Sequence, residues 1–119
     1  MSYLYVFLGG GVGSVCRYGL AVWLNDAAVP FPWGTLAANV LSCLVLGCGM
    51  ALLSKAIIGP DLRLLVLVGF CGGFSTFSTF SNELLTLLRQ AQYGVSLLYF
   101  TVSMLAGLLA IMLGMRLLG

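Results

Sequence analysis

Residues 68–83 read Val-Gly-Phe-Cys-Gly-Gly-Phe-Ser-Thr-Phe-Ser-Thr-Phe-Ser-Asn-Glu, and no charged residue occurs between Arg63 and Glu83. Such an apolar stretch is typical of a membrane helix, but each glycine inside a helix costs about 1 kcal/mol relative to alanine. The serine and threonine hydroxyls can bond to nearby backbone groups and replace lost helical bonds. We therefore predict a membrane helix that is broken at Gly72 and Gly73, near the middle of its span.

A continuous helix that packs through its serine and threonine residues is the other interpretation of this run. Broken backbone in the hydrocarbon region survives only where protein buries it or where it lines a cavity. Freed carbonyl oxygens there could bind a cation, and freed N–H groups an anion. The break therefore predicts a site for ions, whereas the packing helix predicts a structural membrane protein.

The charges on either side of this run divide the chain into four apolar stretches. Of the 119 residues, 61% are hydrophobic and only 7% are charged, whereas about 25% are charged in a soluble domain. A helix that crosses a bilayer needs about 20 mostly apolar residues. The chain is therefore predicted to be one all-α integral membrane domain over residues 1–119. Its spans are expected at about 3–24, 33–53, 62–88 and 95–117.

The distribution of the basic residues only weakly determines the orientation of the chain in the membrane. Four spans place Lys55, Arg63 and Arg116 on the side of both termini, and they leave Arg17 and Arg89 toward the other. The excess of Lys and Arg in short loops sets orientation, and three against two is a small excess. Two interpretations stay open. The chain inserts one way with cytoplasmic termini, or it inserts both ways and pairs as an antiparallel homodimer.

The composition excludes several classes of function. A net charge of +2 from scattered residues gives no clustered basic surface for nucleic acid. No histidine and no cysteine pair with metal-finger spacing is present, so the sequence indicates neither an enzyme nor a zinc site. A small proton-coupled multidrug exporter, the alternative of similar size, needs a carboxylate in the first span. No acidic residue precedes Asp26. The cysteines are expected to be small buried hydrophobes, and they are Cys16, Cys43, Cys48 and Cys71.

Polar side chains recur at helical spacing on the second and fourth spans. Thr35, Asn39 and Ser42 lie on one face of the second span, at i, i+4 and i+7. Tyr99 and Ser103 form a second stripe on the fourth span. Such residues either hold neighbouring helices together or line a polar path. Because the polar residues form stripes and do not occur singly, the interpretation as the lining of a polar path is favoured.

The first span carries a close-packing pair and a charge. Gly9 and Gly13 are four residues apart, a spacing that lets another helix come close. Arg17 lies about one turn from the end of the span. Its side chain either snorkels to the membrane surface or lines an aqueous mouth. The second interpretation is favoured, because charges inside membranes usually face protein or water.

Phenylalanine and serine each recur every third residue in the third span. Phenylalanine in a membrane helix ordinarily packs, but an aromatic ring also has a positive edge that attracts an anion. The serine hydroxyls beside these rings would add hydrogen-bond donors. The residues concerned are Phe74, Phe77 and Phe80, and Ser75, Ser78 and Ser81.

With these motifs the chain resembles the Fluc (CrcB) family of fluoride channels. The resemblance rests on Gly-Gly-Val-Gly-Ser-Val-Cys-Arg17-Tyr18, on Gly34-Thr35-Leu-Ala-Ala-Asn39, and above all on residues 69–81. It implies a channel that passively exports fluoride across a bacterial cell membrane. It also implies a dual-topology antiparallel homodimer with two pores and a structural sodium ion at the centre of the dimer interface.

The resemblance further implies roles for single residues. Main-chain carbonyls of Gly72 and Ser75 from each subunit would hold the sodium ion. Arg17 would lie near the aqueous vestibule, and Glu83 is the acid that follows the break. Gly107 stands where some relatives have a further serine. The residues expected along the fluoride path are Asn39, Phe77, Ser78, Thr79, Phe80, Tyr99 and Ser103.

Overall fold

The computed structural model describes residues 1–25 and 30–119, and within these ranges the chain is helical and contains no strand. Asp26, which the sequence places in the first loop, lies outside the described residues. Four segments are long and apolar enough to cross a membrane, and they confirm the four predicted spans to within one or two residues. They are Ser2–Leu24, Trp33–Ser54, Pro60–Arg89 and Tyr93–Leu118.

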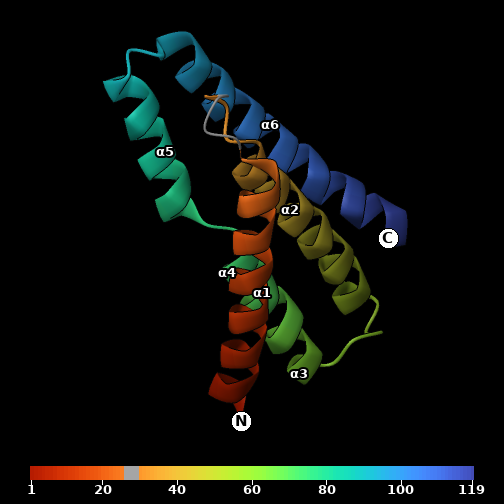
Figure 1. The fold of residues 1–119 in the computed structure, drawn as a ribbon. Helices are drawn as coiled ribbons and strands as arrows, with labels where there is room; N and C mark the ends of the chain where they lie inside the picture. Colours follow the sequence, from red (N-terminus) through yellow and green to blue (C-terminus); the bar gives the residue numbers. More distant parts are fainter. Residues whose placement is uncertain (26–29) are drawn as a thin grey trace.

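The first, second and fourth spans are single helices, whereas the third consists of several segments. The single helices are α1 (Ser2–Leu24), α2 (Trp33–Ser54) and α6 (Tyr93–Leu118). The third span contains α3 (Pro60–Leu62), the π-helix η1 (Arg63–Phe70), α4 (Cys71–Phe74) and α5 (Phe77–Arg89). Both termini and the α2–α3 connection lie away from the end that holds the α5–α6 connection (Figure 1).

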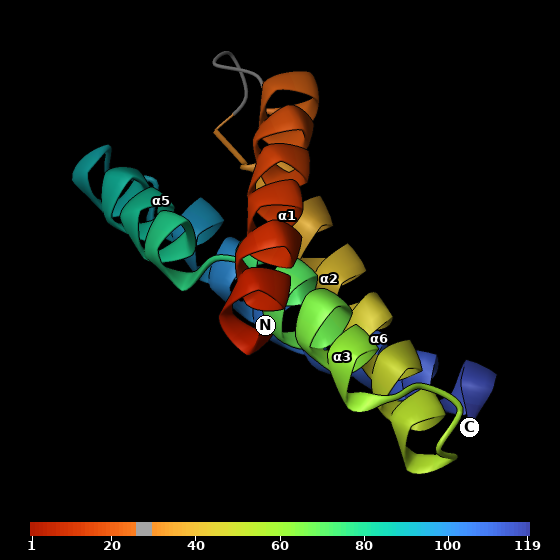
Figure 2. The same ribbon diagram turned by 90° about the horizontal axis from the view of Figure 1, so that it is seen from below.

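Two pairs of helices form the body of the structure, and α5 departs from it. α1 packs along η1 and α4, while α2 packs along α6. α5 turns away after α4 and approaches α6 near the start of that helix (Figures 1 and 2). The buried cluster that joins α2, α5 and α6 consists of Leu36, Phe80, Leu87 and Tyr99.

The helix of the third span is interrupted at Ser75 and Thr76. Both residues have extended backbone, with ψ angles of 154° and 126°. Thr76 caps α5, because its Oγ1 accepts a hydrogen bond of 3.3 Å from the N–H of Thr79. Threonine is a favoured residue at such N-terminal caps. Gly72 and Gly73, where we expected the break, are still helical, so the predicted position was wrong by two residues.

Gly69 and Gly73 serve close packing instead, whereas a Cβ added at Gly72 would meet no described atom within 4 Å. A Cβ added at Gly73 would collide with the backbone of Gly10, and one added at Gly13 would collide with the carbonyl oxygen of Phe70. Gly9 lies equally close to the backbone of η1, at Leu65. The prediction that Gly9 and Gly13 let another helix come close is therefore confirmed. α2 and α6 use Gly47 and Gly114 in the same way.

We predict that Gly13→Ala destabilises the protein, because the added methyl group collides with backbone that cannot rotate away. Overpacking of this kind costs about 1–3 kcal/mol. Gly11→Ala is the matched control, since a Cβ there meets no described atom within 4 Å and alanine favours the helix by about 1 kcal/mol. Thermal unfolding of both purified variants in detergent measures the difference. Equal unfolding temperatures would contradict the packing described here.

Candidate functional site

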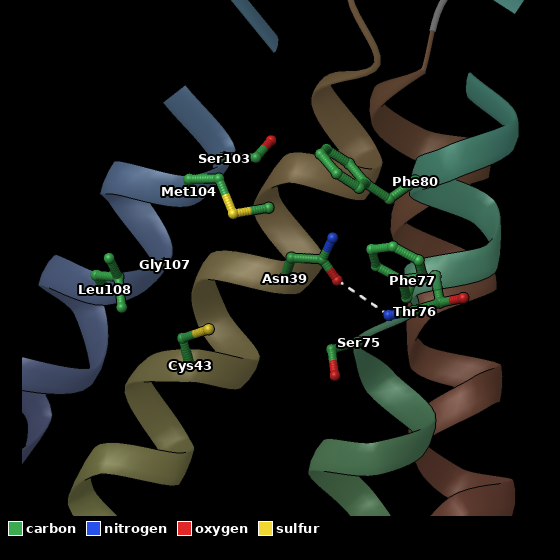
Figure 3. A pocket seen from close by; sticks show the side chains of 10 residues that line it. All are labelled: Asn39, Cys43, Ser75, Thr76, Phe77, Phe80, Ser103, Met104, Gly107 and Leu108. Atoms are coloured by element: carbon green, nitrogen blue, oxygen red, sulfur yellow. Dashed lines mark hydrogen bonds between the residues drawn. The ribbon is translucent and has the colours of Figure 1, made fainter. Parts of the chain in front are cut away.

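A groove of about 290 Å³ lies between α2, α6 and the junction of α4 with α5 (Figure 3). Among the described residues that line it, none is charged, and most of the wall is apolar. A few polar groups in an apolar wall are typical of binding sites for small ligands. The lining residues are Asn39, Cys43, Ser75, Thr76, Phe77, Phe80, Ser103, Met104, Gly107 and Leu108.

Asn39 both holds the helix break and faces the groove. Its Oδ1 accepts a hydrogen bond of 3.1 Å from the N–H of Thr76, which has no helical partner at the break. That bond assigns the amide oxygen to the backbone and leaves the amide nitrogen as a donor. Figure 3 shows this nitrogen turned toward the space beneath Phe80. Asn39 can therefore donate hydrogen bonds to a ligand in the groove.

Phe77 and Phe80 form the aromatic side of the groove. Their ring centroids are 6.3 Å apart, and the ring planes are inclined at 47°. Phe80 is buried against Tyr99, with a centroid distance of 5.0 Å. Phe77 is 77% exposed. One ring is thus fixed by the core, while the other has an open face.

Ser103 contributes a hydroxyl that has no partner. Its Oγ is buried and, among the described residues, forms no hydrogen bond. A buried polar atom without a partner costs about 1–3 kcal/mol. Ser103 lines the groove, so a polar guest there would remove this cost once the hydroxyl turns toward it.

Glu83 joins three helices outside the groove. Its Oε2 accepts a hydrogen bond of 3.0 Å from Thr35 Oγ1 of α2, and its Oε1 accepts one of 3.0 Å from the hydroxyl of Tyr99 of α6. Tyr99 is completely buried. Of the expected path residues, Tyr99 therefore lies behind the groove and orients Glu83. These contacts span 48 and 16 residues of sequence, so periodicity could not reveal them.

Ser78 and Thr79 lie on the first turn of α5 and do not line the groove. Ser78 Oγ lies 3.2 Å from Thr76 Oγ1, and Thr79 Oγ1 lies 3.5 Å from the same oxygen. The three hydroxyls thus gather at the start of the helix. Arg17 also reaches the break, since its Nε donates a hydrogen bond of 3.2 Å to the carbonyl oxygen of Gly73. This part of its guanidinium therefore faces protein.

The carbonyl oxygens of Gly72 and Ser75 are among those at the break that remain without hydrogen-bond donors in the described part of the chain. The N–H of Thr76, which would bond to Gly72 in a helix, is taken by Asn39, and that of Thr79 bonds to a side chain instead of Ser75. In the described part of the chain, no other group donates to the oxygens of Gly72 or Ser75. Such oxygens are ligands for hard cations. No cluster of three or more His, Cys, Asp or Glu residues occurs in residues 1–25 and 30–119.

The polar stripe of α2 holds helices together along its whole length. Thr35 donates to Glu83, Asn39 accepts from Thr76, and Ser42 Oγ donates a bond of 3.0 Å to the carbonyl oxygen of Cys71. All three partners belong to the third span. Of the two interpretations of this stripe, interhelical bonding therefore applies to each member, and Asn39 lines the groove as well.

Comparisons with known proteins agree on one family. The family model described as CrcB-like protein, Camphor Resistance (CrcB), matches residues 4–115. A relative from Phocaeicola vulgatus named fluoride-specific ion channel FluC is 46% identical over 114 residues, which are 95% of this chain and 94% of the relative. Proteins of the same name from Bacteroides fragilis and Thermus thermophilus are 44% and 42% identical. They cover 93% and 97% of this chain, and 91% of their own length in each case.

We predict that Tyr99→Phe lowers the free energy of unfolding by about 1–3 kcal/mol, because Glu83 Oε1 then loses its donor in a largely apolar region. Tyr18→Phe is the matched control, since Tyr18 is 70% exposed. Thermal unfolding in detergent provides the comparison. If the two variants unfold alike, the bond between Tyr99 and Glu83 does not hold α5 against α6.

Proposed function

The chain belongs to the CrcB family, and we propose that it forms a fluoride-selective ion channel in the bacterial cell membrane. The observation that carries this proposal is the groove, whose lining combines the amide of Asn39 and the unpartnered hydroxyl of Ser103 with the rings of Phe77 and Phe80. Fluoride is the smallest halide and the strongest hydrogen-bond acceptor. Fixed donors in a narrow wall replace its water, and larger halides fit poorly.

The electrostatics of the groove suit conduction better than tight binding. An ion must bind well enough to enter a pore and weakly enough to leave it. Uncharged donors and the positive edges of aromatic rings meet both requirements, since they attract an anion without a full counter-charge. The channel lets fluoride leave passively, down its electrochemical gradient, after fluoride has entered the cell as neutral hydrogen fluoride. The protein is therefore a channel and not an enzyme.

The alternative of a proton-coupled multidrug exporter is not supported. Such a protein needs a carboxylate in its first span, and residues 2–24 contain neither Asp nor Glu. The relatives bear the name of a channel.

The functional unit is an antiparallel homodimer with two pores. α5 exposes Phe77 together with the polar side chains of Ser78, Asn82 and Thr86. Polar groups that face lipid are costly, and a second subunit would cover them. The nearly balanced basic residues favour insertion in both orientations. The break at Ser75 and Thr76 lies halfway along the 30 residues of the third span, which fits a position near the middle of the membrane.

A structural sodium ion fits the free carbonyl oxygens of Gly72 and Ser75. With no carboxylate beside these oxygens, a singly charged cation suits them better than a divalent one. The bound ion would supply the positive charge that holds two such breaks together at the centre of the dimer. Arg17 at the neighbouring Gly73 would lie near the aqueous vestibule, and the hydroxyls of Ser78 and Thr79 would continue the fluoride path, while Tyr99 would support it from behind through Glu83.

We predict that a chain locked in one orientation does not conduct. Two lysines inserted after Lys55 strengthen the positive charge of that side, so all copies insert alike and cannot pair antiparallel. Fluoride efflux from cells that express this variant alone should be lost. Coexpression with a variant that carries two lysines after Arg89 should restore it. Normal efflux from either locked variant alone would refute the antiparallel dimer.

We predict that replacing sodium by N-methylglucamine on both sides of the membrane slows or stops fluoride efflux from proteoliposomes. Sodium holds the dimer and is not carried, so tracer sodium should not cross with fluoride. Returning sodium should restore the flux. Unchanged efflux in sodium-free buffer, or stoichiometric sodium movement, would exclude the structural role.

We predict that wild-type proteoliposomes release fluoride and not chloride, and that Phe77→Ile and Phe80→Ile each slow this release about tenfold or more. Isoleucine keeps apolar volume and removes the ring edge, whose attraction reaches about 1.5 kcal/mol, and about 1.36 kcal/mol is a factor of ten in rate. Phe74→Ile is the control, since Phe74 is buried beside Phe70 and lies outside the groove. Similar rates for all three variants would assign the ion to the polar donors alone, and chloride release equal to fluoride release would refute selectivity.

A further inference from the structure

The groove extends beyond Ser103 to a part of the wall formed by Cys43 and Gly107. Cys43 lies one turn after Asn39, on the same face of α2. Figure 3 shows its sulfur pointing from α2 into the groove. A Cβ added at Gly107 would lie 3.5 Å from Cys43 Sγ, so the thiol lies directly against the backbone of α6.

This end of the groove lacks any other donor on the side of α6. After Ser103, the lining residues of α6 are Met104, Gly107 and Leu108, and none of them has a side-chain donor. An anion that leaves Ser103 would therefore lose hydrogen bonds unless the thiol supplied one. A thiol is a weak but genuine donor. Among the described residues, no hydrogen bond involves the sulfur of Cys43.

We propose that Cys43 is a lining residue of the ion path, whose S–H group donates to the ion at the level where Gly107 offers no hydroxyl. This inference rests on the proposed function, because it concerns the same groove. It is carried by the position of the thiol in the lining of the groove, one turn after Asn39 and directly against Gly107, which lies one turn beyond Ser103. From its apolar surroundings in the sequence, Cys43 was expected only to pack; the inference gives it a role in the ion path.

Fluoride efflux from proteoliposomes tests the inference through matched cysteine variants. Cys43→Val keeps the volume and removes the donor, and we expect efflux to fall about fivefold, as for the loss of one hydrogen bond. Cys48→Val, a half-buried cysteine of the same helix outside the groove, should conduct like the wild type. Adding Gly107→Ser to Cys43→Val should restore the flux, because a serine Cβ fits at van der Waals distance and supplies a hydroxyl.

A thiol reagent provides a second measurement that does not depend on the valine variant folding. Methyl methanethiosulfonate converts an accessible thiol to a mixed disulfide and releases methanesulfinate. It should block wild-type efflux at least tenfold and also block Cys48→Ser, whereas Cys43→Ser should conduct and resist it. Mass spectrometry confirms which thiol has reacted.

The outcomes separate the two hypotheses. A wild-type protein that releases no fluoride refutes the proposed function itself. If the wild type conducts, but Cys43→Val equals Cys48→Val in rate, the thiol does not contact the ion. Equal block of Cys43→Ser and the wild type by the reagent would also overturn the inference.

Discussion

The hydrogen bond from the N–H of Thr76 to Asn39 Oδ1 is the contact on which the third span depends. A helix cannot be interrupted inside a membrane unless protein satisfies its freed backbone groups. Asn39 takes one freed N–H, the hydroxyl of Thr76 takes another, and Arg17 donates to the carbonyl oxygen of Gly73. The break is therefore held by side chains of α1 and α2, and the same bond turns the amide nitrogen of Asn39 toward the groove. Asn39 therefore serves both purposes: its oxygen stabilises the break, and its nitrogen is a donor on the proposed conduction path.

The four spans were predictable because charge and length alone determine which segments cross a membrane. The close packing at Gly9 and Gly13 was predictable too, since small residues at this spacing have few other uses in a membrane helix. The position of the break was not. Glycine propensity pointed to Gly72 and Gly73, but tertiary packing against Gly10 keeps that segment helical, and capping by Thr76 sets the start of α5.

The polar residues show the same limit in another form. The spacing on α2 correctly placed these residues on one face, which bonds to the third span, yet it could not name the partners, which lie far away in sequence. Thr35 and Tyr99 meet at Glu83, and Ser42 meets the carbonyl oxygen of Cys71. A polar stripe in a membrane helix therefore predicts a neighbour with complementary groups. Whether the stripe also lines a path depends on which donor and acceptor atoms remain free after those interhelical bonds have formed.

The contacts of α5 explain how distant hydrogen bonds position the aromatic side of the groove. α1 and α2 meet their partners backbone to backbone through glycines, whereas α5 is attached to the body by Phe80 against Tyr99 and by the bonds of Glu83. Glu83 lies about one helical turn beyond Phe80, so the angle it imposes on α5 also sets where the ring of Phe77 stands opposite Asn39. The distance between ring edge and amide donor is thus fixed by a carboxylate that does not line the groove. A carboxylate placed there would stabilise the proposed fluoride path without presenting a negative charge to the anion.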